Sequence, residues 1–281
     1  ERGWWWYDAL VVGGDAYVDH PSFGTAVISR VLEAEGLRVA VLAQPDWHDA
    51  EAFRAMGRPR LGVFIGAGNL DSMVAHYTAA KRRRSEDFYS PGKRTGCRPD
   101  RAAIVYCNRA REAFGPDVPI ILGSLEASLR RFAHYDYWDD SVRRAILFDA
   151  PADLLVYGMG EAATIEIAHR LKKKQSVHTM TDIPGTGYIT RDPSVCKFDH
   201  ITLPSFEDVR DDKRLYAEAT RTEYAEHDPV RGRAMIQPCE GRYLVINPPA
   251  MPLDTRELDR VADLPYTREW HPMYEPLGGV P

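Results

Sequence analysis

The stretch GGDAYVDHPSFG, residues 13–24, places two acids and a histidine directly after the apolar run at residues 9–12. A dinucleotide-binding loop would carry Gly-x-Gly-x-x-Gly at this point, and neither that pattern nor a Walker phosphate loop is present. Asp15 and Asp19 would repel a bare phosphate. His20 is open to three roles: an axial ligand, a proton carrier, or a residue that packs the loop. A single His-Pro in a turn is more often structural than catalytic.

A second stretch, LGSLEASLRRFAHYDYWDDSVRR at residues 122–144, is the densest in polar and aromatic side chains. One interpretation is a helix with i, i+4 ion pairs, Glu126 with Arg130 and Asp139 with Arg143. That interpretation does not explain four aromatic or imidazole side chains within five residues. We therefore predict a docking surface for another domain or for a polar substrate. The alternative is that these side chains fill the domain's own core or fasten the long basic loop upstream. The docking candidates are His134, Tyr135, Tyr137 and Trp138.

Five short apolar runs predict the strands that position these residues, because buried parallel strands are apolar throughout. They lie at residues 9–12, 38–42, 61–65, 118–122 and 154–157. Helices are expected between them, from apolar residues at helical spacing and from glycine turns that precede polar stretches. One helix is expected to begin after residue 24, and three more are expected at residues 71–80, 124–133 and 161–173. The pattern predicts an α/β fold: a doubly wound, mostly parallel five-stranded Rossmann-like sheet with a C-terminal extension.

Four of these strands end in glycine-containing turns, at residues 13–24, 66–71, 123–126 and 158–161. Ligands of open α/β sheets bind at the carboxyl ends of the strands, so we expect the four turns along a single edge. Glycine lets the backbone approach a ligand, and helix N-termini favour anions. The candidate ligand-binding residues are Gly14, Asp15, His20, Gly66, Asn69, Gly123, Ser124, Glu126, Arg130, Gly158, Gly160 and Glu161.

The remainder of the chain is less regular. Residues 81–100 are basic and predict a long surface excursion, and residues 174–205 form a weakly patterned connection. A strand at 243–246 and a helix at 254–262 precede a Pro- and aromatic-rich tail that we expect to lie over another surface. The predicted organisation is a Rossmann-like domain at 1–175 and an irregular α+β extension and linker at 176–281.

Composition limits the classes of function. The 281-residue chain has a net charge of −5, which does not predict a nucleic-acid binder. No apolar stretch approaches the roughly 18–20 residues of a membrane span, and the first residues lack the order of a secretory signal, so we expect a cytoplasmic protein. Cys97, Cys107, Cys196 and Cys239 are too far apart for a CxxC pair or a CxxxCxxC motif, so no metal ligands are expected in this chain.

The chain resembles the YgiQ family of largely uncharacterised bacterial radical S-adenosylmethionine (SAM) proteins. The resemblance runs from about Tyr7 to the last residue. It rests on the strings GDAYVDHPSFG, AQPDW, AGNLDSMVAHYTAAKRRRSEDFYSPG, RPDRAAIVYCNRAREAF, EASLRRFAHYDYWDDSVRRAILFDAPADLLVYGMGE and VINPPAMPL with LPYTREWHPMY. It implies a cobalamin-binding-like fold for this N-terminal portion. The family's chemistry resides in a C-terminal barrel that opens with CxxxCxxC, and that motif is not in this sequence. Ser124 stands where the family usually has a second glycine.

The resemblance implies an accessory domain that covers the barrel of the same chain and helps bind a substrate of unknown identity. The full-length protein would carry a [4Fe–4S] cluster and SAM, with ligands outside this segment. We do not expect cobalamin, because its signature is Asp-x-His-x-x-Gly, whereas Asp19 and His20 are adjacent and Gly24 comes four residues later. Two alternatives stay open. One is a stand-alone module that binds an anionic or tetrapyrrole ligand without catalysis. The other is an RNA-contacting module that uses residues 81–84, Arg94, Arg98 and Tyr89.

Overall fold

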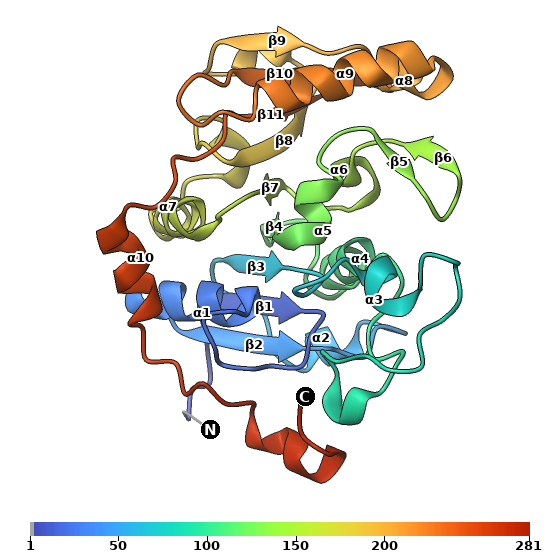
Figure 1. The fold of residues 1–281 in the computed structure, drawn as a ribbon. Helices are drawn as coiled ribbons and strands as arrows, with labels where there is room; N and C mark the ends of the chain where they lie inside the picture. The colour runs from blue at the N-terminus through green and yellow to red at the C-terminus, as the bar shows by residue number, and fades with distance from the viewer. Residues whose placement is uncertain (1–2) are drawn as a thin grey trace.

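The computed structural model describes residues 3–281, and it confirms the five expected strands as one parallel array (Figure 1). The chain passes from β1 outward to β2 and then returns past β1 to β3, so the winding reverses between β1 and β3. Ligands of such sheets bind outside the carboxyl ends of the strands at this reversal. In spatial order the strands are β2 (Val39–Ala43), β1 (Ala9–Gly13), β3 (Gly62–Ile65), β4 (Ile120–Leu122) and β7 (Leu154–Val156).

The sheet does not stop at five strands, which corrects the expected strand number. It has nine strands, because the segment expected to be irregular adds four more beyond β7. These are β8 (Thr186–Thr190), β11 (Arg242–Ile246), β10 (Ala234–Cys239) and β9 (His200–Thr202), in spatial order. Glu240 and Gly241 both have positive φ and close the β10–β11 hairpin, as a two-residue loop requires. The division at residue 175 therefore falls within one continuous sheet.

Helices cover both faces of the sheet, which confirms a doubly wound arrangement (Figure 1). On one face α1 (Gly24–Ala34) and α7 (Glu161–Lys172) pack against each other and over Val11, Phe64 and Ile121. On the other face α2, α4 and α6 enclose a core that contains Val12, Ile65 and Leu122. Their bounds are α2 (Glu51–Arg54), α4 (Ala102–Phe114) and α6 (Ile146–Asp149). The C-terminal extension contributes three α-helices: α8 (Phe206–Asp211), α9 (Lys213–Ala225) and α10 (Thr255–Ala262).

Two expected helices are shorter in the structure. The helix expected at 71–80 is α3 (Ser72–His76), which ends because Tyr77 is extended. The helix expected at 124–133 is α5 (Ser124–Leu129). The next residues form an antiparallel hairpin of β5 (His134–Asp136) and β6 (Ser141–Arg143). Asp136 accepts hydrogen bonds from the backbone N–H groups of Trp138 and Asp139, and this local bonding favours the turn over a helix.

The C-terminal tail lies over another part of the same chain, as expected. It runs from α10 along the β1–β2 side of the molecule and ends in the 3₁₀ helix η4 (Pro272–Leu277) near η1 (Pro91–Lys93) (Figure 1). The Tyr274 hydroxyl accepts a hydrogen bond from the Tyr17 backbone N–H, and Gly92 N–H donates to the Gly279 carbonyl. The tail therefore holds both the loop after β1 and the basic excursion. No helix within residues 3–281 is long and apolar enough to cross a membrane.

Candidate functional site

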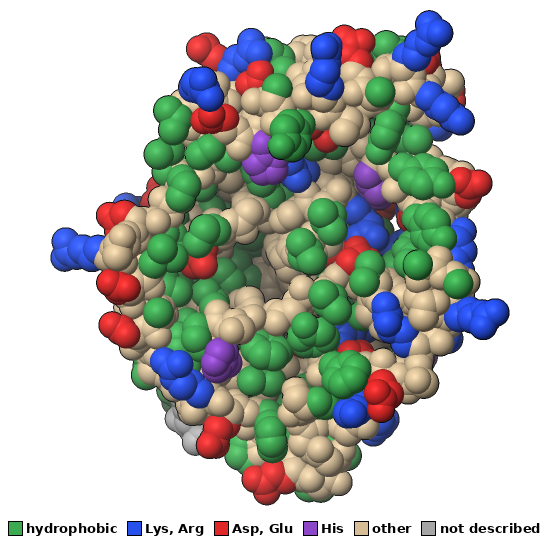
Figure 2. Space-filling view, in the orientation of Figure 1, with side chains coloured by type: hydrophobic (Ala, Val, Ile, Leu, Met, Phe, Trp, Pro, Cys, Tyr) green, Lys and Arg blue, Asp and Glu red, His purple; other side chains and the backbone are tan. Residues whose placement is uncertain are grey.

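A cavity of about 350 Å³ lies at the carboxyl edge of the sheet, between the ends of the strands and the first turns of α1 and α7. Figure 2 shows this face hollowed near its middle, with apolar side chains around the hollow. All four glycine turns contribute to its lining, which bears out the expectation that they share one edge. Of the candidate residues, the cavity is lined by Gly66, Gly123, Ser124, Gly158, Gly160 and Glu161.

The cavity combines apolar walls with one buried acceptor. Val12, Ile28, Phe64 and Val156 line it, and such walls favour an apolar or aromatic group. Glu161 stands in the first turn of α7, and its Oε2 is buried without a hydrogen-bond partner among residues 3–281. A buried acceptor without a donor costs free energy, so a ligand that carries an N–H or O–H would relieve that cost.

Gly14 and Asp15 lie behind this cavity. A Cβ at Gly14 would sit 2.0 Å from the Ala67 carbonyl oxygen, so only glycine allows this close approach of the two turns. Asp15 is buried, and it accepts hydrogen bonds from the Asn69 backbone N–H at 2.6 Å and from Arg98 at 2.5 Å. Both residues therefore shape the edge rather than face a ligand.

Arg98 is an exception within the basic excursion at 81–100, whose residues 81–86 and Arg94 are exposed, as expected of a surface segment. Its side chain is fully buried, with Nη1 on Asp15 and Nη2 on both oxygens of Asp87. A guanidinium is the group best suited to join two buried carboxylates. The sequence analysis treated Arg98 only as one of several basic residues, because no residue near it in the sequence indicates that it pairs with Asp15.

His20 and Asp19 do not line the cavity. The His20 Nδ1 accepts a hydrogen bond from the Ser22 backbone N–H at 3.1 Å, so its ring packs the turn. Asp19 pairs with Arg30 and accepts a hydrogen bond from the Thr267 backbone N–H at 2.9 Å. Burial raises the pKa of Asp19, but the bonds from Arg30 and Thr267 outweigh it and hold the pKa below its ordinary value. Asn69 bridges the loop, because its side chain donates to the Ser22 carbonyl at 3.0 Å.

Glu126 and Arg130 do not pair with each other, which corrects the i, i+4 interpretation. The Glu126 carboxylate is fully buried and accepts from the backbone N–H groups of Ser72 at 2.9 Å and Ala103 at 3.0 Å. It thereby caps the N-termini of α3 and α4 together. Burial, with the nearby charge of Asp71, raises the pKa of Glu126. Arg130 instead forms an ion pair with Asp71, so both candidates hold helices in place.

Ser124 occupies an unusual backbone position. Its φ of 75° lies in the left-handed region that favours glycine. Its Oγ accepts a hydrogen bond from the Ala67 backbone N–H at 3.1 Å, which offsets part of that strain. Serine is therefore accommodated where the family usually has glycine, and its side chain ties two turns of the edge together.

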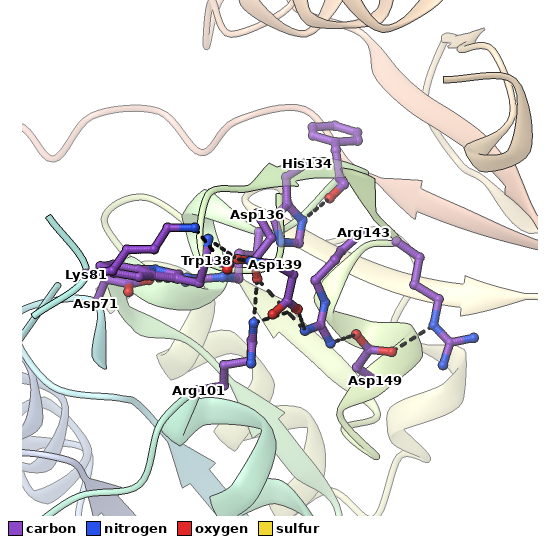
Figure 3. A network of polar contacts seen from close by, with 12 residues as sticks. Asp71, Lys81, Arg101, His134, Asp136, Trp138, Asp139, Arg143 and Asp149 are labelled. Carbon is purple, nitrogen blue, oxygen red and sulfur yellow. Dashed lines mark hydrogen bonds and ion pairs between the residues drawn. The ribbon is translucent and has the colours of Figure 1, made fainter. Parts of the chain in front are cut away.

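The β5–β6 hairpin is held by an ion-pair network rather than by helical pairs (Figure 3). Arg101, the residue directly before α4, reaches Asp136 at 3.0 Å and Asp139 at 2.7 Å. Asp139 also pairs with Arg143 at 3.0 Å, so the expected i, i+4 pair exists, but across a hairpin. Burial raises the pKa of Asp136, but the hydrogen bonds from Arg101 and from the turn outweigh it and lower the pKa. The His134 Nδ1–H donates to the Phe132 carbonyl at 3.0 Å, and burial lowers the pKa of its ring.

Two of the three other docking candidates, Tyr137 and Trp138, contact the segment after α3, whereas the Tyr135 hydroxyl donates to Asp140 and its backbone N–H donates to the Tyr216 hydroxyl. The Tyr137 hydroxyl donates to the Ala79 carbonyl at 2.6 Å, and the Trp138 ring lies 5.2 Å from that of Tyr77. Lys81 donates to the Trp138 carbonyl at 3.2 Å (Figure 3). These contacts agree with the alternative that the stretch fastens the loop upstream. Tyr135 and Tyr137 are half-exposed, at 49% and 48%, so a docking role for them stays a prediction.

The cysteines offer no site for a metal cluster. Cys107 and Cys239 are buried in separate hydrophobic clusters, and all four thiols are free. Within residues 3–281 no group of three or more His, Cys, Asp or Glu side chains is placed to hold a metal ion. The residues of this segment therefore do not fit a [4Fe–4S] cluster.

A mostly parallel sheet with a cavity at its winding reversal defines the class of protein: a Rossmann-like domain. The radical SAM N-terminal family model matches residues 1–281, and the chain belongs to that family. UPF0313 (YgiQ-family) proteins are close relatives, which confirms the resemblance seen in the sequence. A Clostridium botulinum strain 657 protein is 54% identical over 274 residues, covering 98% of this chain and 43% of its own length. A Clostridium perfringens strain SM101 protein is 54% identical over 280 residues, covering 100% of this chain and 42% of its own length.

The chain thus spans about two fifths of the length of these relatives. Among solved structures, it is similar to TsrM, a radical SAM methyltransferase from Kitasatospora setae. One TsrM structure, with tryptophan substrate and a SAM analogue bound, gives a TM-score of 0.40 at 21% identity, covering 64% of this chain and 28% of that one. A second TsrM structure, with cobalamin and a [4Fe–4S] cluster bound, gives a TM-score of 0.39 at 19% identity, covering 64% of this chain and 26% of that one.

Proposed function

We propose that this chain is the accessory part of a radical SAM enzyme, and that its edge cavity holds part of the enzyme's substrate. Membership of the radical SAM N-terminal family and the greater length of the relatives support this proposal. The observation that carries it is the cavity itself, which unites four strand ends, apolar walls and the unpartnered Glu161 carboxylate oxygen.

We infer that this edge faces the barrel in the full-length protein. Leu125 and Leu129 of α5 are 44% and 59% exposed, and Met159 of the cavity turn is 47% exposed. The helix lies against that turn, because the Ser128 hydroxyl accepts a hydrogen bond from the Gly158 backbone N–H at 3.4 Å. Apolar side chains gathered at the mouth of a cavity favour coverage by another surface. The barrel of the same chain is the proposed partner.

The full-length protein is proposed to carry a [4Fe–4S] cluster and SAM, whose reductive cleavage supplies a substrate radical. The cluster ligands would come from the part of the protein outside this segment, because its own cysteines do not fit the cluster. What the present chain supplies is binding and orientation. Apolar walls exclude water from the bound group, and Glu161 accepts one hydrogen bond from it.

We do not expect cobalamin in the full-length protein. A histidine that ligates a metal through Nε2 usually donates its Nδ1–H to a carboxylate or carbonyl. Here His20 Nδ1 accepts from the Ser22 N–H, which places the ring proton on Nε2 and opposes ligation there. Corrinoid absorbance of the purified full-length protein tests this expectation.

The alternative is a stand-alone binding module, in which the lining residues between Val11 and Thr164 would form the whole site. A nucleic-acid partner is not expected. Of the basic residues considered for such a partner, Arg98 is buried and paired with Asp15 and Asp87, so it is not free for phosphates. A cytoplasmic location also remains a prediction.

A cavity-blocking variant tests the proposed function. Gly24 lines the cavity, its φ is not positive, and a Cβ there meets no atom within 4 Å. Gly24→Phe should therefore fill the cavity without backbone strain, whereas Gly24→Ala leaves most of it open. In anaerobically reconstituted full-length protein, we expect Gly24→Phe to abolish the stimulation of SAM cleavage by a cell metabolite extract. Unstimulated cleavage should persist in both variants. Equal stimulation of both variants would contradict the proposal.

A further inference from the structure

Arg131 is a half-buried arginine that has no ion pair. No carboxylate within residues 3–281 lies within the 4.0 Å that defines one, and the Arg131 Nε is buried without a hydrogen-bond partner. A guanidinium carries five N–H donors, and leaving one of them buried and unbonded costs free energy. Most other half-buried arginines near the hairpin, such as Arg130 and Arg143, do pair with carboxylates.

The guanidinium of Arg131 is nevertheless held in a fixed place. Its Nη1 donates to the Ser128 carbonyl at 2.6 Å, and its Nη2 lies 3.2 Å from His227 Nδ1. Its central carbon lies 5.0 Å from the centre of the Tyr157 ring. The Tyr157 hydroxyl in turn donates to the Asn247 carbonyl at 2.6 Å. The charged group is therefore preorganised by α5, by the end of β7 and by the residues after α9.

One acidic side chain interacts with this charge without forming an ion pair. Glu223 on α9 interacts electrostatically with Arg131, but the two form no ion pair. Burial raises the pKa of Glu223 to about 7, against the lowering effect of Arg131. Burial also lowers the pKa of Arg131 itself, as expected for a cation that lacks a close counter-charge. Below the pKa of Glu223 the site therefore carries an uncompensated positive charge, and the Arg131 guanidinium keeps N–H donors that form no ion pair with a carboxylate of residues 3–281.

We propose that Arg131 anchors a binding site for an oxyanion, the carboxylate or phosphate group of a small ligand, between the end of β7 and α9. A planar guanidinium with free N–H groups matches both chemistries. The site adjoins the edge cavity, because Tyr157 directly precedes Gly158, which lines that cavity. The proposal does not depend on the function proposed above: the oxyanion would bind whether or not the protein is a radical SAM enzyme.

Titrating the full-length protein with inorganic phosphate and, separately, with acetate tests this site. Calorimetry at pH 8 and constant ionic strength would measure the dissociation constants. We expect saturable binding of at least one probe, and the probe that binds more tightly identifies the group. Arg131→Gln should weaken that binding at least tenfold. Glu223→Gln should tighten it severalfold, because it removes a competing negative charge.

Arg38→Gln is the matched control. Arg38 is also half-buried, lies 3.8 Å from the centre of the Trp6 ring and forms no ion pair within the described residues. Its loss should leave binding of the probe unchanged. Unaltered binding in Arg131→Gln, or a Glu223→Gln variant that binds no tighter than the wild type, would overturn the proposal. So would an absence of saturable binding of both probes, the result expected if an acid elsewhere in the full-length chain occupied Arg131.

Discussion

Arg98 and Asp15 are joined by a buried ion pair, with Nη1 of the arginine 2.5 Å from Oδ1 of the aspartate, although 83 residues separate them. The arginine also holds Asp87 at 2.7 Å. This pairing fixes the basic excursion against the loop after β1. It explains why an acidic loop follows the first strand: one of its acids is an internal counter-charge rather than a ligand contact.

Replacing Arg98 should therefore be costly. Arg98→Met leaves two buried carboxylates without a cation, and removing one partner of a buried pair destabilises a protein by about 3–5 kcal/mol. Urea denaturation measures the change. Arg94→Gln, at an exposed position of the same excursion, should change the free energy of unfolding by less than about 0.5 kcal/mol. Similar effects of the two variants would contradict a central role for Arg98.

Glu126 should be sensitive even to an isosteric change. Its two carboxylate oxygens each accept one helix N-terminal N–H, and glutamine offers only one oxygen. Glu126→Gln should lower the free energy of unfolding by about 1–3 kcal/mol, and hydrogen exchange should quicken at the start of α3 or α4. Glu112→Gln, at a half-exposed position of α4, provides the comparison, with an expected loss of about 0–1 kcal/mol.

Two substitutions at Ser124 separate backbone strain from hydrogen bonding. Ser124→Gly relieves the left-handed strain but loses the bond from Ala67 N–H, and each effect is worth about 1 kcal/mol. Its stability should thus stay close to that of the wild type. Ser124→Ala keeps the strain and loses the bond, so it should be less stable than Ser124→Gly. The reverse order in thermal denaturation would argue against this interpretation.

The attachment of the tail should weaken in acid. The pKa of Asp19 in the folded protein lies below its ordinary value of 3.8, so its contribution to stability is present above that value. The contribution is lost as the pH falls through the lower, folded pKa. Hydrogen exchange at Thr267 and Arg268, whose N–H groups bond to Asp19, should reveal this opening.

Asp19→Asn should open the same segment already at neutral pH and flatten its pH dependence. Asp263→Asn, an exposed change just before the tail, should preserve the wild-type profile. An Asp19→Asn variant with the protection and acid response of the wild type would show that the tail is held by other contacts.

Local sequence determined the five parallel strands, the four glycine turns and their common edge. Short apolar runs such as residues 61–65 can be buried only as inner strands, and strand direction then places every following turn at the same end. The hairpin and the short α5 were not predicted, because helical spacing in residues 124–133 cannot reveal that Asp136 bonds to the turn ahead of it. The strand expected at 243–246 is β11, but the other strands of the extension were missed. In the case of β8 the reason is that residues 186–190, with a glycine and two threonines, lack a clear apolar pattern.

The roles of individual polar residues were decided only by the tertiary structure. Asp15, Glu126 and Arg130 were candidates for a ligand, yet each finds its partner elsewhere in the chain. Glu161 lines the cavity and keeps a buried oxygen without a partner among residues 3–281. The sequence shows which side chains are charged, but it does not show which of them become buried next to each other on folding. A buried charge requires a partner, and that partner is set by the packing of distant segments rather than by local spacing.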